Sequence, residues 1–202
     1  MSEQTFYYTI ERNSTAEFKD RGSKFIALAF PIQSVDDFKS QYQQVKKEHA
    51  KAVHHCFGYR IGNEGNVFRV SDDGEPSGTA GKPILGQLDS KQIVNAAVVV
   101  VRYFGGTLLG VPGLINAYKT AASLALQLTP LVQKQVMLVY KLSFDYTRMN
   151  DVMMIVKLFG CEIRSSETML FCEMLVSIPK ARIDEVLYKL NELRAVEMTK
   201  VG

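Results

Sequence analysis

With 202 residues, the chain is long enough for one large domain or two small ones, each with its own core. Its hydrophobic fraction of 47% and charged fraction of 22% are typical of a folded protein and exclude a disordered one. The net charge of +3 permits contact with nucleic acid but falls short of the strong basic excess of a dedicated nucleic-acid binder.

The first half of the chain is expected to mix strands and helices. In chain order we predict strands at 6–11 and 24–32 joined by a polar turn at 19–23, an amphipathic helix after Ser34, a hairpin of 51–61 with 66–71, a short helix near 79–88, a central strand, and a helix at about 112–128. Ser34 with Asp37 resembles a capping box, which marks the start of the first helix.

The segment from Ile93 to Gly113 is the most informative for function. Val98–Val101 are four consecutive β-branched residues, which indicates a strand covered on both faces. Arg102 follows where that burial ends, and a loop with several glycines leads into the next helix. We predict that the guanidinium, free backbone amides and the helix N-terminus converge on one spot, which suits an anion such as phosphate. A turn whose glycines only permit tight packing is the alternative.

Thr129-Pro130 breaks the last of these helices, since a residue before proline is pushed out of the helical region. We therefore predict two domains, residues 1–130 and 131–202. The second is expected to contain strands at 136–144, 161–165, 170–178 and 195–201, with helices near 152–159 and 183–190. This β-α-β-β-α-β order is that of the ferredoxin-like split unit.

Cysteine usage and the first residues indicate the compartment. Cys56, Cys161 and Cys172 are odd in number and widely scattered, which predicts reduced thiols. The N-terminus, MSEQTFYYTIER, lacks the basic and apolar regions of a signal peptide, and no later segment approaches the length of a membrane span. We therefore expect a cytoplasmic protein without membrane contact.

His54-His55-Cys56 invites a catalytic interpretation, because a thiol needs a nearby base to become a thiolate. Side chains of a strand alternate between faces, so His55 and Cys56 point oppositely while His54 and Cys56 share a face. A small cysteine on a covered face is more often part of the core. We predict that Cys56 is structural.

Two acidic features leave alternatives open. Asp72 and Asp73 could hold Mg²⁺ together with a substrate phosphate, or they could form a turn that satisfies its own backbone amides. Arg102 could bind a ligand or form an ion pair with Asp72, Asp73 or Glu75, and the two roles can coexist.

Several segments resemble the signature of the YigZ/IMPACT family: Ser23-Lys24-Phe25, His54-His55-Cys56, Ser71–Pro76, Gly78–Leu85, and Val99–Gly106 continuing to Gly110. The resemblance covers nearly the whole chain. It implies an α+β protein, in which an N-terminal ribosomal-protein fold with a left-handed βαβ crossover is followed by a ferredoxin-like βαββαβ domain similar to the fifth domain of elongation factor G. Eukaryotic IMPACT proteins restrain the amino-acid-starvation kinase of translation initiation, and they carry an extra N-terminal RWD domain for which this chain has no room.

We predict a cytosolic binding protein without catalysis, which engages RNA, the ribosome or a translation factor and could modulate translation. Its anion site is predicted to comprise Lys24, His54, His55, Lys82, Arg102, Tyr103, Gly105 and Gly106. Tyr103 or Phe104 is expected to stack on a base, and no cofactor is expected. The alternatives are a Mg²⁺-dependent enzyme acting on a phosphorylated small molecule, with Asp72 or Asp73 as the metal ligand, and a module that docks a protein partner.

Overall fold

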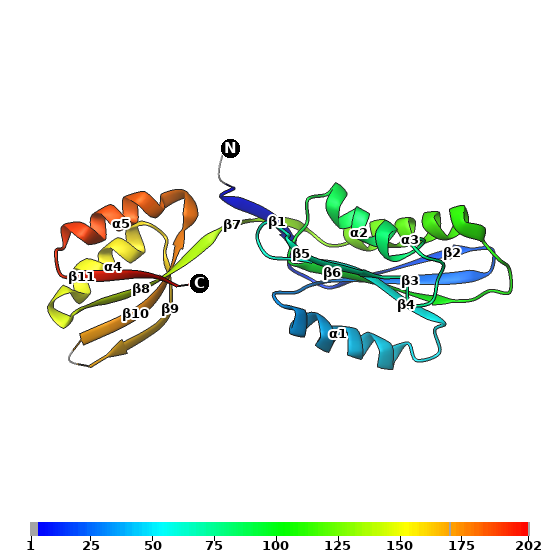
Figure 1. Ribbon diagram of the computed structural model, residues 1–202, viewed down its shortest axis with the longest axis horizontal. Helices are drawn as coiled ribbons and strands as arrows, with labels where there is room; N and C mark the ends of the chain where they lie inside the picture. Colours follow the sequence, from blue (N-terminus) through cyan, green and yellow to red (C-terminus); the bar gives the residue numbers. More distant parts are fainter. Residues whose placement is uncertain (1–3, 170, 202) are drawn as a thin grey trace. The chain divides into compact units, whose positions relative to one another are not determined.

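The computed structural model describes residues 4–169 and 171–201 (Figure 1). The chain divides into two compact units. One is Tyr7–Lys134, and the other is the chain from Gln135 onward together with the N-terminal residues through Phe6. The predicted boundary after residue 130 lies four residues before this division, and that prediction did not separate the N-terminal residues from the first unit.

The first unit is built on a five-stranded sheet in the order β2-β3-β6-β4-β5, in which all neighbours are antiparallel. Its strands are β2 (Ser14–Asp20), β3 (Ser23–Pro31), β4 (His54–Ile61), β5 (Val67–Ser71) and β6 (Ala96–Tyr103). Helix α1 (Val35–Glu48) covers one face, and helices α2 (Gly81–Ser90) and α3 (Gly110–Gln127) cover the other (Figure 1). The sheet is thus enclosed between two helical layers.

The central strand β6 explains the two cores of this unit. Val98–Val101 are fully buried, which confirms the prediction of a strand covered on both faces. Val98 and Val100 belong to the core beneath α2 and α3, whereas Val99 and Val101 belong to the core beneath α1. Adjacent residues of β6 therefore serve different layers, as the two-residue period of a strand requires.

The first hairpin differs from the prediction. The strands at 6–11 and 24–32 were expected to be joined by a polar turn, but a further strand, β2, lies between them in the chain, and β1 (Phe6–Ile10) pairs with β7 (Leu131–Gln135). The partner of β3 is β2. No strand was predicted there, and the last two residues of β2 were assigned to a polar turn. Because β2 is an edge strand with charged residues at alternate positions, its apolar signal is weak. The two-residue turn between β2 and β3 has positive φ at both residues, 45° and 78°, as a tight hairpin requires.

The second unit contains a four-stranded antiparallel sheet in the order β11-β8-β10-β9. In chain order its elements are β8 (Met137–Asp145), the short helix η1 (Tyr146–Arg148), α4 (Met149–Leu158), β9 (Glu162–Thr168), β10 (Phe171–Pro179), the short helix η2 (Lys180–Arg182), α5 (Ile183–Glu192) and β11 (Val196–Val201). This succession and strand order define a ferredoxin-like fold and confirm the prediction. Leu170, the first residue of the strand predicted at 170–178, lies outside the described residues.

Both helices of this unit pack on the same face of its sheet (Figure 1). The core between them includes Leu142 and Phe144 of β8, Met174 of β10, Val152 of α4 and Leu190 of α5. Among the described residues, the opposite face of the sheet carries no helix of this unit. Within the part of the chain that the structure describes, no helix is both long enough and apolar enough to cross a membrane.

Candidate functional site

Arg102 is the second-to-last residue of β6 and is buried, with 5% of its surface exposed. Its Nη1 donates to Glu75 Oε1 at 2.6 Å, and the Tyr118 hydroxyl donates to the same oxygen at 2.8 Å. We call Arg102, Glu75, Tyr118, His54 and Ser23 the Arg102 cluster. It brings together β3, β4, β6, α3 and the loop before α2, which are distant in sequence but adjacent at one end of the sheet.

The guanidinium of Arg102 is only partly hydrogen-bonded. Its Nη2 lies 3.4 Å from Ser23 Oγ, and its Nε is buried without a hydrogen-bond partner among the described residues. Two rings flank the group, with Arg102 Cζ 5.4 Å from the Phe25 ring centroid and 5.6 Å from that of Phe104. The group is therefore fixed by an ion pair at one end and by two aromatic contacts.

His54 is held in a defined tautomer. Its Nδ1 lies 2.7 Å from the Asp73 carbonyl oxygen, which can only accept, so Nδ1 carries the hydrogen. In the neutral ring, Nε2 is then an acceptor, and it lies 3.8 Å from Glu75 Oε1. Protonation of Nε2 would turn this contact into an ion pair.

Cys56 lies beneath the cluster and is fully buried. Its sulfur is 3.0 Å from the Asp72 carbonyl oxygen and 3.4 Å from the Tyr118 hydroxyl. Burial, reinforced by the nearby negative charges, raises the pKa of the Cys56 thiol to about 12, so the nucleophilic thiolate is scarce at neutral pH. This environment fits the structural role that we predicted.

The two predicted metal ligands have separate structural partners. The Asp72 carboxylate accepts backbone N–H groups from Gly78 at 2.8 Å, Ala80 at 3.0 Å and Gly81 at 2.8 Å, which closes the loop and caps α2. Burial tends to raise the pKa of Asp72, but these three amides outweigh it and hold the pKa below its usual value. Asp73 Oδ2 accepts the backbone N–H of His55 at 2.7 Å.

The two carboxylates thus accept hydrogen bonds from different elements, Asp72 from the loop before α2 and from its first residue, and Asp73 from β4. Among the described residues, no three His, Cys, Asp or Glu side chains gather closely enough to hold an ion.

The predicted anion-site residues divide between the two faces of the sheet. His54 and Arg102 are directly paired across β4 and β6 and face α2 and α3. Lys24, His55 and Tyr103 lie on the opposite face, towards α1. The structure therefore does not bring these five side chains to one site, and the reason is the alternation of side chains along a strand.

The residues on the α1 face have partners of their own. Lys24 Nζ pairs with Glu17 Oε2 at 2.9 Å, and the Tyr103 hydroxyl lies 2.9 Å from His49 Nδ1. His55 Nε2 lies 3.1 Å from the His49 carbonyl oxygen. They form a second polar group that is separate from the Arg102 cluster.

The glycine loop contributes through close backbone contact. A Cβ on Gly105 would lie 1.9 Å from the carbonyl carbon of Gly22, so the loop rests directly on the β2–β3 turn. Gly105 N also donates to Ser23 Oγ at 3.2 Å. Gly106 is exposed with φ +86° and lacks such a contact.

The N-terminus of α3 stands apart from the cluster, contrary to the predicted convergence. Tyr118 is the residue of α3 that reaches Glu75, and Gly110 begins the helix eight residues earlier. At 1.5 Å per residue this is about 12 Å along the axis. Lys82 is exposed in the first turn of α2, beside the loop that carries Glu75.

Sequence reasoning named Glu75 only as one of three acidic candidates, and it missed Tyr118 altogether. Tyr118 is a large polar residue within a helix otherwise rich in alanine, and its full burial there required a polar partner. The contrast between this tyrosine and the surrounding alanines could have indicated from the sequence that Tyr118 belongs to a buried polar cluster. Ser23 entered the sequence analysis only through the family resemblance.

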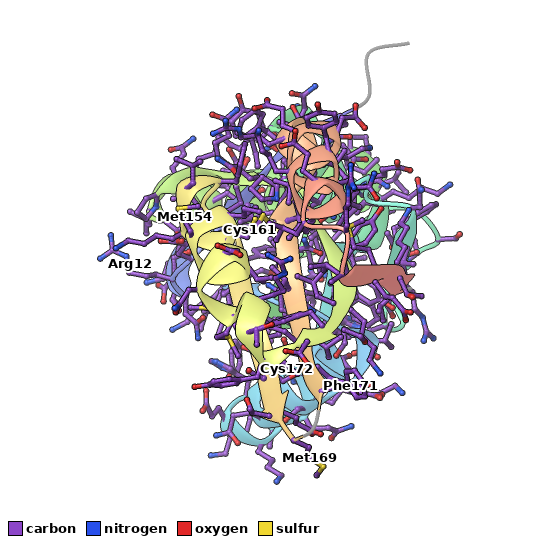
Figure 2. The ribbon with its side chains drawn as sticks, turned by 90° about the vertical axis from the view of Figure 1, so that its left-hand side faces the viewer. Arg12, Met154, Cys161, Met169, Phe171 and Cys172 are labelled. Atoms are coloured by element: carbon purple, nitrogen blue, oxygen red, sulfur yellow. The ribbon has the colours of Figure 1, made fainter. Side chains whose placement is uncertain are left out.

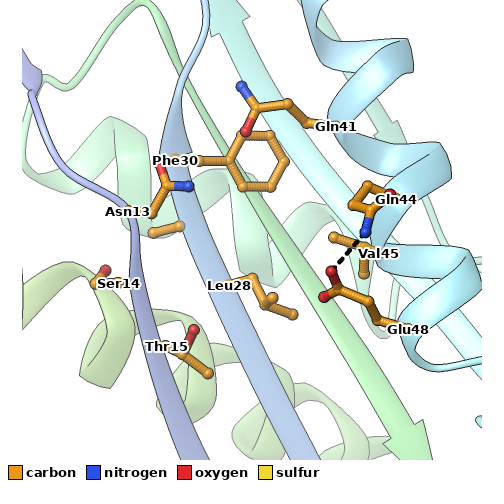
Figure 3. Close-up of a pocket in the computed structure, with 10 residues that line it drawn as sticks. Asn13, Ser14, Thr15, Leu28, Phe30, Gln41, Gln44, Val45 and Glu48 are labelled. Atoms are coloured by element: carbon orange, nitrogen blue, oxygen red, sulfur yellow. Dashed lines mark hydrogen bonds between the residues drawn. The ribbon is translucent and has the colours of Figure 1, made fainter.

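A separate hollow of about 180 Å³ lies on the α1 side (Figure 3). It is lined by Asn13, Ser14, Thr15, Leu28, Ala29, Phe30, Gln41, Gln44, Val45 and Glu48. None of the predicted site residues is among them. Two of its polar groups bond internally, since Gln44 Nε2 donates to Glu48 Oε1 at 2.7 Å and Gln41 Nε2 to the Pro31 carbonyl oxygen at 3.1 Å.

The open sheet face of the second unit has a different character. Lys141 of β8 and Glu173 of β10 face away from the helices and form an ion pair at 2.7 Å. Met169 and Phe171 are exposed at the β9–β10 turn, by 82% and 67% (Figure 2). A nearby hollow of about 550 Å³ is lined by Ser143, Phe144, Asp145, Phe171, Glu173, Arg194, Ala195, Val196 and Glu197. The lining of this hollow carries three carboxylates and one guanidinium, which is unfavourable for an anion.

Comparison with known proteins supports the resemblance seen in the sequence. The Impact N-terminal domain family matches residues 21–126. The chain is 34% identical over 172 residues to the IMPACT family member YigZ of Escherichia coli (strain K12), with 84% of each chain covered. It is 35% identical over 146 residues to the IMPACT family member YvyE of Bacillus subtilis (strain 168), which covers 72% of this chain and 67% of that one.

Two further matches extend the comparison. Protein IMPACT of Rattus norvegicus is 34% identical over 100 residues, which is 47% of this chain and 31% of that protein. A crystal structure described as that of a hypothetical protein matches 98% of both chains, with 28% identity and a TM-score of 0.76. The fold and the Arg102 cluster thus define a two-unit α+β protein built on an Impact N-terminal domain. The chain belongs to the IMPACT family.

Proposed function

We propose that the protein is a non-catalytic, cytosolic binding protein that engages RNA of the translation apparatus through its N-terminal unit. The observation that carries this proposal is the ring of Phe104, which is 49% exposed and lies 5.6 Å from the Arg102 guanidinium. An exposed aromatic ring beside a cation is a stacking surface for an unpaired base, a contact worth about 1–3 kcal/mol. Phe104, rather than Tyr103, takes this role because the Tyr103 hydroxyl is bonded to His49 on the other face.

The distribution of charge supports the same unit. Residues 135–202 contain nine Lys or Arg and nine Asp or Glu, so they carry no net charge. Residues 1–134 contain 15 basic and 12 acidic residues and therefore carry the whole net charge of +3. Lys82 is exposed at the start of α2, beside the loop that carries Glu75, where it can contact a phosphate.

A protein-docking module is the second candidate. Leu108, Val111 and Ile115 follow Phe104 in the chain and are 82%, 52% and 38% exposed. Exposed apolar side chains of this kind favour contact with a protein surface. The two candidates differ in their dependence on salt, because phosphate contacts release counterions.

Fluorescence anisotropy with a labelled single-stranded oligoribonucleotide at several salt concentrations tests the proposal. Phe104→Ala should weaken binding about tenfold or more, because a stacked base is lost. Lys82→Ala should weaken it and reduce the slope of log affinity against log salt by roughly one unit. Phe171→Ala and Lys47→Ala are matched controls, since Phe171 is an exposed ring in β10 of the second unit and Lys47 an exposed cation on α1.

The controls should leave binding unchanged. If the Phe104 and Lys82 variants bind RNA as the wild type does, or if the wild type binds with no salt dependence, the RNA proposal fails and protein docking becomes the better hypothesis.

A further inference from the structure

One edge of the Arg102 guanidinium lacks a strong hydrogen-bond acceptor among the described residues. Nη1 is committed to Glu75 at 2.6 Å. Nε and Nη2 lie together on another edge, where Nε has no partner among the described residues and Nη2 has only the long 3.4 Å contact with Ser23. A buried N–H that has lost water without gaining a partner is costly and rare in folded proteins. This edge therefore calls for an acceptor.

We propose that the Nε–Nη2 edge of Arg102 is a binding site for a phosphate monoester group, recessed beneath the ring of Phe104. Two parallel N–H donors on a planar guanidinium match two oxygens of such a group. Glu75 binds at Nη1, so it orients the guanidinium and leaves this edge free. In an RNA ligand the group is the phosphate at the chain end, an assignment that rests on the proposed RNA binding.

Ser23 supplies a third donor. Its Oγ already accepts from Gly105 N at 3.2 Å and faces Arg102 Nη2 at 3.4 Å. Both of these neighbours are donors, so the hydroxyl hydrogen of Ser23 must point elsewhere. Among the described residues no acceptor takes it. Arg102 Nε and the Ser23 hydroxyl thus have no acceptor among the described residues, and Arg102 Nη2 has only its long contact with Ser23 Oγ.

The depth of this edge selects a monoester over an internal phosphodiester. The Arg102 side chain is 6% exposed, and its guanidinium lies close to the rings of Phe25 and Phe104. A phosphodiester carries chain on both sides, so it cannot approach a buried edge end-on. A terminal phosphate has one ester bond and three free oxygens, and it can.

Phe104 is suited to uncover the edge. Its ring is 49% exposed, and the residues from Phe104 to Leu108 are all exposed. Because Phe104 belongs to neither core of this unit, we expect rotation of its side chain to give a ligand access to the edge, with the displaced ring then available to stack on the terminal base.

The test compares two single-stranded oligoribonucleotides of identical sequence, one with a 5′-phosphate and one with a 5′-hydroxyl, binding to the full chain and to its Arg102→Lys variant. Lysine keeps a cation beside Glu75 but removes the Nε–Nη2 edge. The wild type should bind the 5′-phosphorylated strand about tenfold more tightly, and Arg102→Lys should bind both strands equally. Circular dichroism establishes whether the variant is folded, and Ser23→Ala, which should reduce the preference severalfold, replaces it if it is not.

The outcomes separate this site from the proposed function. If the wild type binds both strands equally, or if the variants retain the preference, the monoester site is overturned while RNA binding stands. If the wild type binds neither strand, RNA binding fails, and thermal unfolding in inorganic phosphate decides the site. A melting temperature raised by phosphate in the wild type but not in the variants assigns the site to a small phosphorylated molecule, and equal shifts overturn it.

Discussion

The two faces of the five-stranded sheet use neighbouring residues for different purposes. Towards α2 and α3, His54 and Arg102 meet a buried carboxylate beneath an exposed ring. Towards α1, His55 and Tyr103, the next residue of each strand, bond to His49 and lie against an aromatic core. A short run of conspicuous residues in a strand therefore describes two environments, and a site inferred from such a run must be divided by face before it is interpreted.

The largest difference between the faces should be in the cost of removing a carboxylate. Glu75→Gln leaves the buried Arg102 without its counter-charge, and we expect the free energy of unfolding to fall by about 3–5 kcal/mol. The matched variant on the other face is Glu17→Gln, which breaks an exposed pair with Lys24 and should cause no measurable loss. Urea unfolding followed by circular dichroism measures both. Equal losses in the two variants would show that burial does not distinguish the faces.

Cys56 gives the next largest effect. Cys56→Ala should lower the free energy of unfolding by about 1 kcal/mol, because it removes a buried side chain beneath Tyr118. Since burial raises the pKa of this thiol to about 12, folded protein should react with an alkylating reagent at the half-buried Cys161 before Cys56. Mass spectrometry of digested, labelled protein identifies the site. Rapid labelling of Cys56 that also abolished ligand binding would revive a reactive role.

The α1 face should lose stability in mild acid. Burial, aided by nearby positive charge, lowers the pKa of His49 below its ordinary value of 6.5. The fold thus favours the neutral ring, so the stability linked to His49 is complete above about pH 6.5 and is lost as pH falls through the lower, folded pKa. Unfolding titrations from about pH 7 to about pH 5 should show this decline. His49→Gln should flatten it, and a decline of the same slope in the variant would exclude His49 as its source.

A smaller effect on the same face tests the hydrogen bond alone. Tyr103→Phe removes the hydroxyl that lies 2.9 Å from His49 Nδ1 and should cost about 0.5–1.5 kcal/mol. RNA binding should be unchanged, because this side chain is not on the face of Phe104. Loss of binding in folded Tyr103→Phe protein would mean that the two faces cooperate in one site.

The segment that joins the two units should be the part of the chain that a protease cuts first. We propose that limited proteolysis nicks the chain near Thr129–Gln133 or at the exposed Lys134 before it cuts within either unit. Two resistant fragments, detected by mass spectrometry, are the expected products. A stable fragment that spans Pro130 would contradict separable units.

Periodicity in the sequence was sufficient for much of the fold. The apolar run of Val98–Val101 predicted the central strand, and the alternation from Val136 onward predicted the ferredoxin-like unit. Strand β2 was missed because only Ala16 and Phe18 face the core, among charged neighbours. The strength of the local apolar pattern therefore determined which elements could be predicted.

The site was less accessible to prediction, because its contacts span long stretches of chain. Arg102 meets Glu75 across 27 residues and Tyr118 meets Glu75 across 43, and no local pattern encodes such pairs. The division of the anion-site residues between the two faces of the sheet could have been predicted from the sequence. The alternation that separated His55 from Cys56 also separates Tyr103 from Arg102, and it was applied only to the first pair.

Through Gly105 and Gly22, the loop that carries Phe104 is in direct backbone contact with the β2–β3 turn. At this point the two backbones touch without intervening side chains, so there is no soft layer to absorb a displacement. A rotation of the Phe104 side chain that shifts the backbone of Gly105 must therefore be transmitted to the β2–β3 turn. A fluorescent probe attached in place of the exposed Arg21 would therefore detect the binding of a ligand beneath the Phe104 ring.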